Sequence, residues 1–86
     1  MPKISEFFGI AIYLYFNDHP PAHFHARYGG HEAVVGIDEL AVLEGSLSPR
    51  ALGLVMEWAS LHQEELHEAW NRARAHEAPG RIEPLS

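Results

Sequence analysis

The sequence contains no cysteine and few basic side chains. Without thiols the chain forms neither disulfides nor thiolate metal sites, so any metal ion must be held by histidine, aspartate or glutamate. Six lysines and arginines stand against twelve acidic residues, which gives a formal net charge of −6 with neutral histidines. This balance argues against tight binding of nucleic acid, because such binding depends on neutralising phosphates.

Long apolar runs are also absent. No segment approaches the roughly 20 apolar residues that cross a bilayer, and the N-terminus lacks the basic start and apolar stretch of a signal peptide. We therefore expect no membrane contact and a cytoplasmic location. The 86 residues are expected to form a single domain over 1–86. Its parts are predicted to be a β-sheet over 1–45, a helix over 46–78 and a tail over 79–86.

The first half of the chain has the alternating pattern of β-strands. Apolar residues alternate along Ile10–Phe16, and the two prolines of Asn17–Ala22 end this strand. His23–Tyr28 and His31–Ile37 flank the pair Gly29-Gly30, which indicates a hairpin because glycine tolerates the positive φ of tight turns. Two further short strands are expected at 4–8 and 41–44. The prediction is a small antiparallel sheet of three to five strands in an α+β fold.

The diglycine turn fixes the register of this hairpin. The expected pairs are Tyr28 with His31, Arg27 with Glu32, His25 with Val34 and His23 with Gly36. Because side chains alternate along a strand, one face is apolar and forms the core; it carries Phe24, Ala26, Tyr28, Ala33, Val35 and Ile37. The opposite face carries His23, His25, Arg27, Glu32 and Val34.

The second half of the chain is helical. Ser48 is a suitable N-cap, Pro49 suits the first helical position, and apolar residues recur every three or four positions. Such a helix would be about 40 Å long, whereas the strands reach only roughly 17–24 Å. Either the helix folds back near Leu61-His62, or a homodimer or small partner protein covers its apolar seam. The seam consists of Leu54, Trp58, Leu61, Leu66 and Trp70.

One dense polar cluster follows the first long strand. His23 and His25 are two residues apart on a strand, so they share a face with Cα atoms roughly 6.5–7 Å apart. Asp18 and His19 lie in the proline-rich loop before them, and Arg27 lies two residues beyond. The candidate catalytic residues are therefore His23, His25, Arg27 and Asp18.

Three interpretations of this cluster remain open. In the first, His23 and His25 bind a divalent transition metal such as zinc, with His19 or Asp18 as the third ligand. In the second, the two histidines act as base and acid on a phosphodiester without a metal, and Arg27 stabilises developing charge. In the third, the histidines are half-exposed strand residues, and Arg27 and Glu32 form an ion pair worth under about 1 kcal/mol.

Several motifs resemble the bacterial domain-of-unknown-function family 4160. They lie along essentially the whole chain, and the hallmark is Asp18-His19-Pro20-Pro21-Ala22-His23-Phe24-His25. The other matching segments are 2–5, 7–10, Tyr28-Gly29-Gly30, and the stretch from Pro49 through Trp58, His62 and Leu66 to Trp70. Tyr13 stands where the resemblance suggests a charged or polar residue, which makes this face less basic.

The resemblance implies a stand-alone bacterial protein encoded beside another small protein, in an arrangement similar to a toxin–antitoxin pair. The leading functional hypothesis is therefore a protein-interaction module in such a two-gene pair. The alternative is a metal-dependent or histidine-driven hydrolase, for example a ribonuclease, acting from the face with His23 and His25. Nucleic-acid binding is the third hypothesis and ranks last because of the acidic charge.

Overall fold

A five-stranded antiparallel sheet and two helices build the molecule. The computed structural model describes residues 2–86. The strands are β1 (Lys3–Phe7), β2 (Ile10–Tyr13), β3 (His23–Tyr28), β4 (His31–Gly36) and β5 (Val42–Gly45), and they are ordered β1-β2-β3-β4-β5 in the sheet. The helices are α1 (Pro49–Leu61) and α2 (Gln63–Arg74). The predicted α+β fold is confirmed.

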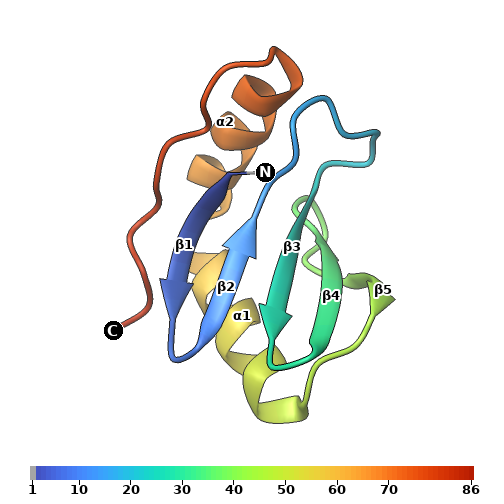
Figure 1. The fold of residues 1–86 in the computed structure, drawn as a ribbon, viewed down its shortest axis with the longest axis vertical. Coiled ribbons are helices and arrows are strands. Elements are labelled where there is room, and N and C mark those ends of the chain that lie inside the picture. The colour runs from blue at the N-terminus through green and yellow to red at the C-terminus, as the bar shows by residue number, and fades with distance from the viewer. Residues whose placement is uncertain (1) are drawn as a thin grey trace.

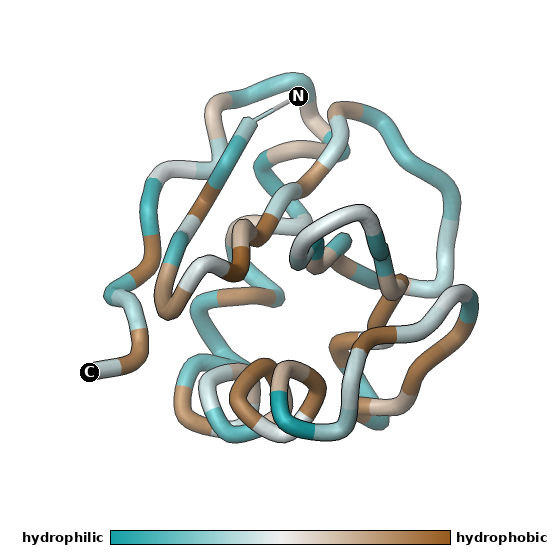
Figure 2. The backbone as a smooth tube through the Cα atoms, turned by 60° about the horizontal axis from the view of Figure 1, so that its bottom comes forward, coloured by the Kyte–Doolittle hydropathy of each residue, from teal (hydrophilic) through white to brown (hydrophobic). Residues whose placement is uncertain are grey.

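The sheet is a simple meander, and α1 covers one of its faces (Figure 1). The β3–β4 hairpin has the predicted register, from Tyr28 opposite His31 to His23 opposite Gly36. Hydrophilic and hydrophobic segments lie close together along the backbone (Figure 2). Ile12, Phe24 and Val35 are fully buried on the side of α1. The predicted core face is therefore the one that packs on the helix.

Trp58 is the centre of the core. This side chain of α1 is fully buried, and its ring lies 5.3 Å from that of Phe7 and 5.8 Å from that of Phe24. The C-terminal residues complete the packing, since Trp58 Nε1 donates to the carbonyl of Glu83 at 2.8 Å and the Ile82 amide donates to the Ile4 carbonyl at 2.7 Å. The tail thus runs beside the outer edge of β1 (Figure 1).

The prediction of one helix over 46–78 is wrong in one respect, because the chain turns at His62. Its φ of −125° interrupts the helical path, and α2 starts again at Gln63. The Gln63 side chain donates to the carbonyls of Ile37 and Asp38 at 2.7 and 3.0 Å, which ties α2 to the end of β4. Of the two alternatives for an overlong helix, the chain takes the fold-back near Leu61-His62.

The fold-back covers most of the predicted seam within the chain itself. Trp58 and Leu66 are fully buried and Trp70 is 7% exposed, while Leu54 is partly buried and Leu61 is 65% exposed. These three buried side chains are not available to a partner in this conformation. An overhanging helix therefore no longer argues for a dimer, and any case for a partner must rest on another surface.

The first long strand is shorter than predicted. β2 ends at Tyr13, and Phe16 is 44% exposed rather than part of the core face. Its ring stacks on that of His76 with centroids 6.4 Å apart, beyond the end of α2.

In residues 2–86, no helix is long and apolar enough to pass through a bilayer.

Candidate metal centre

Asp18, His23 and His25 come together on the face of the sheet opposite to α1. The two histidines alternate with the core residue Phe24 along β3, so both rings leave the same face. The loop between β2 and β3 folds over them and brings Asp18 within reach. Both histidines are buried, with exposures of 5% and 9%. The interpretation of His23 and His25 as half-exposed strand residues is therefore wrong.

The ring of His23 is held at both nitrogens. Its Nδ1 lies 2.7 Å from the carbonyl oxygen of Pro21, and its Nε2 lies 2.8 Å from Oδ2 of Asp18. A carbonyl oxygen only accepts hydrogen bonds, so Nδ1 must carry a hydrogen. Nε2 donates a hydrogen bond to Asp18 Oδ2 when the ring is doubly protonated, and in the neutral ring it carries the lone pair that a metal ion could take at the same place.

His25 repeats this arrangement with a different anchor. Its Nδ1 lies 3.0 Å from Oε2 of Glu32, and its Nε2 lies 3.4 Å from the same Asp18 Oδ2. Both neighbours are carboxylates and only accept, so the shorter contact favours the hydrogen on Nδ1, and in that neutral tautomer Nε2 carries the lone pair. Two imidazole Nε2 atoms thus converge on one carboxylate oxygen.

This convergence brings together three side chains that could hold a metal ion. The three possible ligand atoms of Asp18, His23 and His25 lie within 4.8 Å of one another, and they form the one such group of three or more found in residues 2–86. Imidazole and carboxylate ligands at about 2.0–2.2 Å suit zinc, which places tetrahedral ligand atoms about 3.4 Å apart. The separation of His25 Nε2 from Asp18 Oδ2 already has this value, and that of His23 Nε2 is 0.6 Å shorter.

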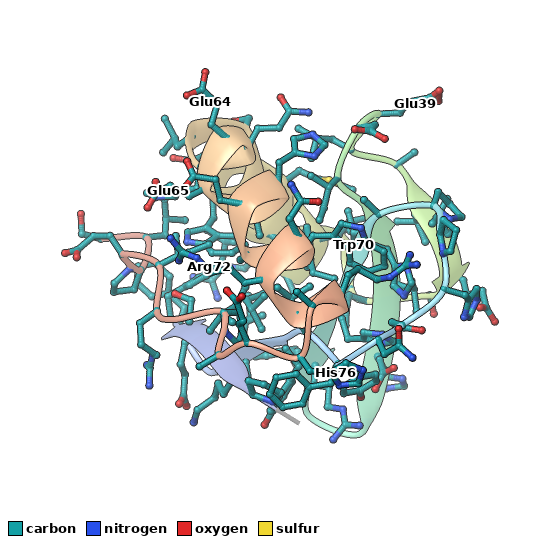
Figure 3. All side chains as sticks on the ribbon, turned by 90° about the horizontal axis from the view of Figure 1, so that it is seen from above. Glu39, Glu64, Glu65, Trp70, Arg72 and His76 are labelled. Carbon is teal, nitrogen blue, oxygen red and sulfur yellow. The ribbon has the colours of Figure 1, made fainter. Side chains whose placement is uncertain are left out.

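The anchors at Nδ1 match the outer shell of known metal sites. Histidine ligands usually donate their second N–H to a carboxylate or a backbone carbonyl, which fixes the tautomer and the ring orientation. Glu32 and the Pro21 carbonyl supply one acceptor of each kind. Trp70 of α2 adds packing, since its ring lies 5.1 Å from that of His23. Figure 3 shows the position of Trp70 on α2 beside the sheet.

The carboxyl groups of Asp18 and Glu32 both have lowered pKa values. Burial by itself raises the pKa of Asp18, but the His19 backbone N–H and hydrogen bonds from His25 and His23 outweigh it and lower that pKa below the ordinary value. For Glu32, burial likewise raises the pKa, and hydrogen bonds from His25 and Arg27 outweigh it. Both groups are therefore ionised at neutral pH and available as acceptors or ligands.

Arg27 does not join the cluster directly. Its Nε donates to Oε1 of Glu32 at 2.7 Å and its Nη2 donates to the Tyr15 hydroxyl at 3.1 Å, while the guanidinium lies over the ring of Tyr13. The predicted ion pair with Glu32 is present. Arg27 thus acts on His25 through Glu32, rather than by pointing at the convergence of the two Nε2 atoms.

His19 is placed differently from the other predicted ligands. Its side chain is 84% exposed, and its Nδ1 lies 3.1 Å from Oδ1 of Asp18, the oxygen that does not face the two buried histidines. Its ring centroid is 5.7 Å from that of His23. Of the two residues proposed as third ligand, the structure therefore brings Asp18 into the group and leaves His19 at the rim.

The cluster opens into a solvent-accessible hollow of about 480 Å³. Its walls come from the loop, from β3 and from the two strands beyond, and they include Tyr15, Asp18, His19, Pro21, His23, His25, Val34, Leu43 and Glu44. A metal ion bound by three protein ligands keeps a coordination position free, as catalytic zinc sites do. The hollow beside the three side chains has room for a small molecule.

Sequence reasoning did not assign Glu32 or Trp70 to this site. Glu32 was predicted only as the partner of Arg27, although the hairpin register also places it diagonally from His25, close enough for a carboxylate to reach a ring nitrogen. Trp70 was assigned to the helical seam. The length of the helix indicated a fold-back near Leu61-His62 as one of two alternatives, but nothing in the sequence indicated that this turn carries Trp70 to His23.

Comparison with known proteins agrees with the resemblance. No curated protein and no solved structure matches this chain. The model of a family described as a domain of unknown function, DUF4160, matches residues 9–71, which include the whole cluster and its anchors. By this match over most of its length, the chain belongs to the DUF4160 family.

Proposed function

We propose that this protein binds one divalent transition metal ion, zinc foremost, through Asp18, His23 and His25, and that it is a metal-dependent hydrolase. The observation that carries the proposal is the pair of Nε2 atoms converging on one Asp18 oxygen, each on a ring whose Nδ1 already donates elsewhere. In the neutral rings both Nε2 atoms could bind one ion beside Asp18, whose oxygen they otherwise reach as hydrogen-bond donors.

The roles follow from these positions. A bound divalent ion would supply a hydroxide at neutral pH, because it lowers the pKa of water to about 7. Asp18, His23 and His25 hold the ion, and Glu32 and the Pro21 carbonyl orient the two rings. His19 lies at the rim, exposed and hydrogen-bonded to the outer oxygen of Asp18, where an imidazole can take and return a proton.

The first experiment measures metal binding. Protein purified without a histidine tag is stripped with chelator and titrated with Zn²⁺ by calorimetry, and its metal content is measured by mass spectrometry. We expect one equivalent to bind, and Asp18→Asn, His23→Ala and His25→Ala each to weaken binding by about a hundredfold or more. His31→Ala is the matched control, because His31 lies exposed on the same hairpin. Equal affinities in all four variants would overturn the proposal.

The second experiment measures hydrolysis. Zinc-loaded and chelated protein are compared on activated ester, anilide and phosphodiester substrates, and circular dichroism checks that the variants are folded. We expect turnover that requires the ion and that disappears in His25→Ala. If the protein binds zinc tightly but hydrolyses none of these substrates, the proposed metal site stands and the proposed hydrolase function is wrong.

A second candidate function is a protein-interaction module in a toxin–antitoxin-like pair, as a homodimer or with a small partner. It is favoured by the edge strand β5, where Val42 and Leu43 are 38% and 46% exposed, while the tail lies along the other edge of the sheet. Free edge strands pair readily with another chain. Light scattering on a size-exclusion column measures the oligomeric state, and Val42→Lys tests whether the β5 edge forms the contact. A monomer that does not bind the product of the neighbouring gene would contradict it. Both candidates include the predicted cytoplasmic location.

A further inference from the structure

The hollow beside Asp18, His23 and His25 has a lining that differs from that of a phosphate-binding site. Its nine lining residues include no lysine or arginine. The nearest guanidinium of the cluster, that of Arg27, is engaged by Glu32 and Tyr15. Phosphate esters need cations or fixed donors around their non-bridging oxygens. Apart from the proposed ion and His19, a phosphodiester in this hollow would meet the carboxylate of Glu44 rather than a fixed cation.

The rest of the wall is apolar and ends in one acidic group. Val34, Leu43 and Pro21 line it together with Glu44. The register of the sheet orders three of these groups, since His25 pairs with Val34 and Val34 pairs with Glu44. With strands about 4.8 Å apart, the Cα atoms of His25 and Glu44 are roughly 10 Å apart across the sheet.

This row of residues defines the shape of a ligand. One end would lie at the ligands of the ion, the middle would pass over Val34, and the far end would reach the carboxylate of Glu44. We propose that the substrate is a neutral or cationic acyl compound, an amide or ester, with an amine or other donor a few bonds from its carbonyl. The inference rests on the proposed hydrolase function and names the substrate class of the same site.

The reaction balances with water as the only co-reactant. The proton lost by water passes to His19, and the hydroxide oxygen forms a bond to the carbonyl carbon. The bond from that carbon to the leaving nitrogen or oxygen then breaks, and the leaving group takes the proton from His19. The products are a carboxylic acid and an amine or alcohol, and the protein returns to its starting state.

Four p-nitrophenyl compounds test this inference on the zinc-loaded full chain. Three are p-nitroanilides whose acyl groups differ in charge, namely 4-aminobutyryl, butyryl and succinyl, and the fourth is bis(p-nitrophenyl) phosphate. An extended 4-aminobutyryl group places its ammonium about 5 Å from the carbonyl carbon, which fits within the roughly 10 Å between the Cα atoms of His25 and Glu44. We expect kcat/KM to fall from 4-aminobutyryl to succinyl by about a hundredfold, with no turnover of the phosphodiester.

Glu44→Gln provides the decisive comparison. Glu44 is exposed, so loss of this carboxylate should reduce the preference for the 4-aminobutyryl over the succinyl anilide by about two- to fivefold. Glu39→Gln is the matched control, because Glu39 is an exposed carboxylate that lines a neighbouring hollow rather than this one. Zinc content is measured in each sample, so that a loss of metal is not mistaken for a loss of selectivity.

Each outcome decides a different point. Faster turnover of the phosphodiester, or equal turnover of the three anilides, would overturn the substrate class and leave the metal-dependent hydrolase in place. A preference that survives Glu44→Gln unchanged would also overturn it. Zinc binding without turnover of any compound would overturn the hydrolase function and the substrate class together, and absence of zinc binding would overturn the metal site itself.

Discussion

The indole of Trp70 packs against the imidazole of His23, with ring centroids 5.1 Å apart and planes inclined by 52°. This contact joins α2 to the candidate metal centre. A paramagnetic ion such as Co²⁺ or Ni²⁺, bound to Nε2 of His23, would lie close enough to the indole to quench its fluorescence. We therefore expect titration with either ion to quench the tryptophan emission of the metal-free protein to a saturable plateau.

Trp70→Phe isolates this signal. The variant keeps Trp58, which is buried in the core against Phe7 and Phe24, so it remains fluorescent. We expect most of the quenching to disappear in Trp70→Phe, while calorimetry still detects binding. The same quenching in wild type and variant would place the ion elsewhere.

Glu32 should set the metal affinity without contacting the ion. Its Oε2 accepts from Nδ1 of His25, and its Oε1 accepts from Nε of Arg27. Glu32→Gln keeps the size of the side chain but can present an N–H to His25, which disturbs the tautomer needed for metal binding. We expect the zinc dissociation constant to rise about 10–100-fold. Glu39→Gln serves as control, and an unchanged constant in Glu32→Gln would remove Glu32 from the site.

The same carboxylate should contribute a pH-dependent part of the stability of the metal-free protein. Its pKa is lowered in the folded state, where hydrogen bonds from His25 and Arg27 outweigh the effect of burial. The folded state therefore binds a proton less readily than the unfolded state, whose glutamate pKa is about 4.3. The stabilisation is fully present above that value and is lost as the pH falls through the lower folded pKa.

Comparison of wild type with Glu32→Gln measures this contribution, because the glutamine does not titrate. Urea denaturation between pH 7 and pH 3 should show a wild-type advantage in the free energy of unfolding near pH 7. The advantage should shrink as the pH falls below about 4.3. A difference that stays constant over this range would contradict the assignment.

Ser5 has the one buried side-chain oxygen, among residues 2–86, without a hydrogen-bond partner. It lies on β1 with 1% exposure. A buried hydroxyl without a partner costs about 1–3 kcal/mol, so Ser5→Ala should leave the free energy of unfolding unchanged or raise it by up to about 1 kcal/mol. Ser60→Ala, on an exposed hydroxyl of α1, should change it by less than about 0.5 kcal/mol. A loss above 1 kcal/mol in Ser5→Ala would show that the hydroxyl is hydrogen-bonded in solution.

Much of this fold could be read from local sequence patterns. The alternation along His23–Tyr28 and the Gly29-Gly30 turn fixed the hairpin register residue by residue, and Ser48 caps α1 as expected by accepting from the Ala51 amide at 3.3 Å. These features depend on neighbours a few residues apart, which a sequence displays directly. The shared face of His23 and His25 followed from the same periodicity.

The parts that sequence reasoning missed depend on contacts between distant segments. The fold-back near Leu61-His62 could be given only as one of two alternatives, because no glycine or proline marks it. The contacts that accompany it, from Gln63 to Ile37 and Asp38, join residues about 25 positions apart. The choice of Asp18 over His19 as third member of the group depends on how the loop folds over β3. The course of the tail likewise depends on Trp58 and Ile4 rather than on any pattern within 79–86.

That tail should contribute to the stability of the whole domain. Ile82 is 5% exposed, and the carbonyl of Glu83 satisfies the indole N–H of the fully buried Trp58. Deleting residues 81–86 exposes the Ile82 contact surface, worth about 1.5–3 kcal/mol, and leaves the indole donor without its acceptor, at about 1–3 kcal/mol. We expect the free energy of unfolding to fall by about 2.5–6 kcal/mol in urea denaturation. Deleting only Ser86, which is exposed, should change it little. A truncated chain as stable as the full one would show that water replaces both interactions and that the outer edge of β1 does not need the tail.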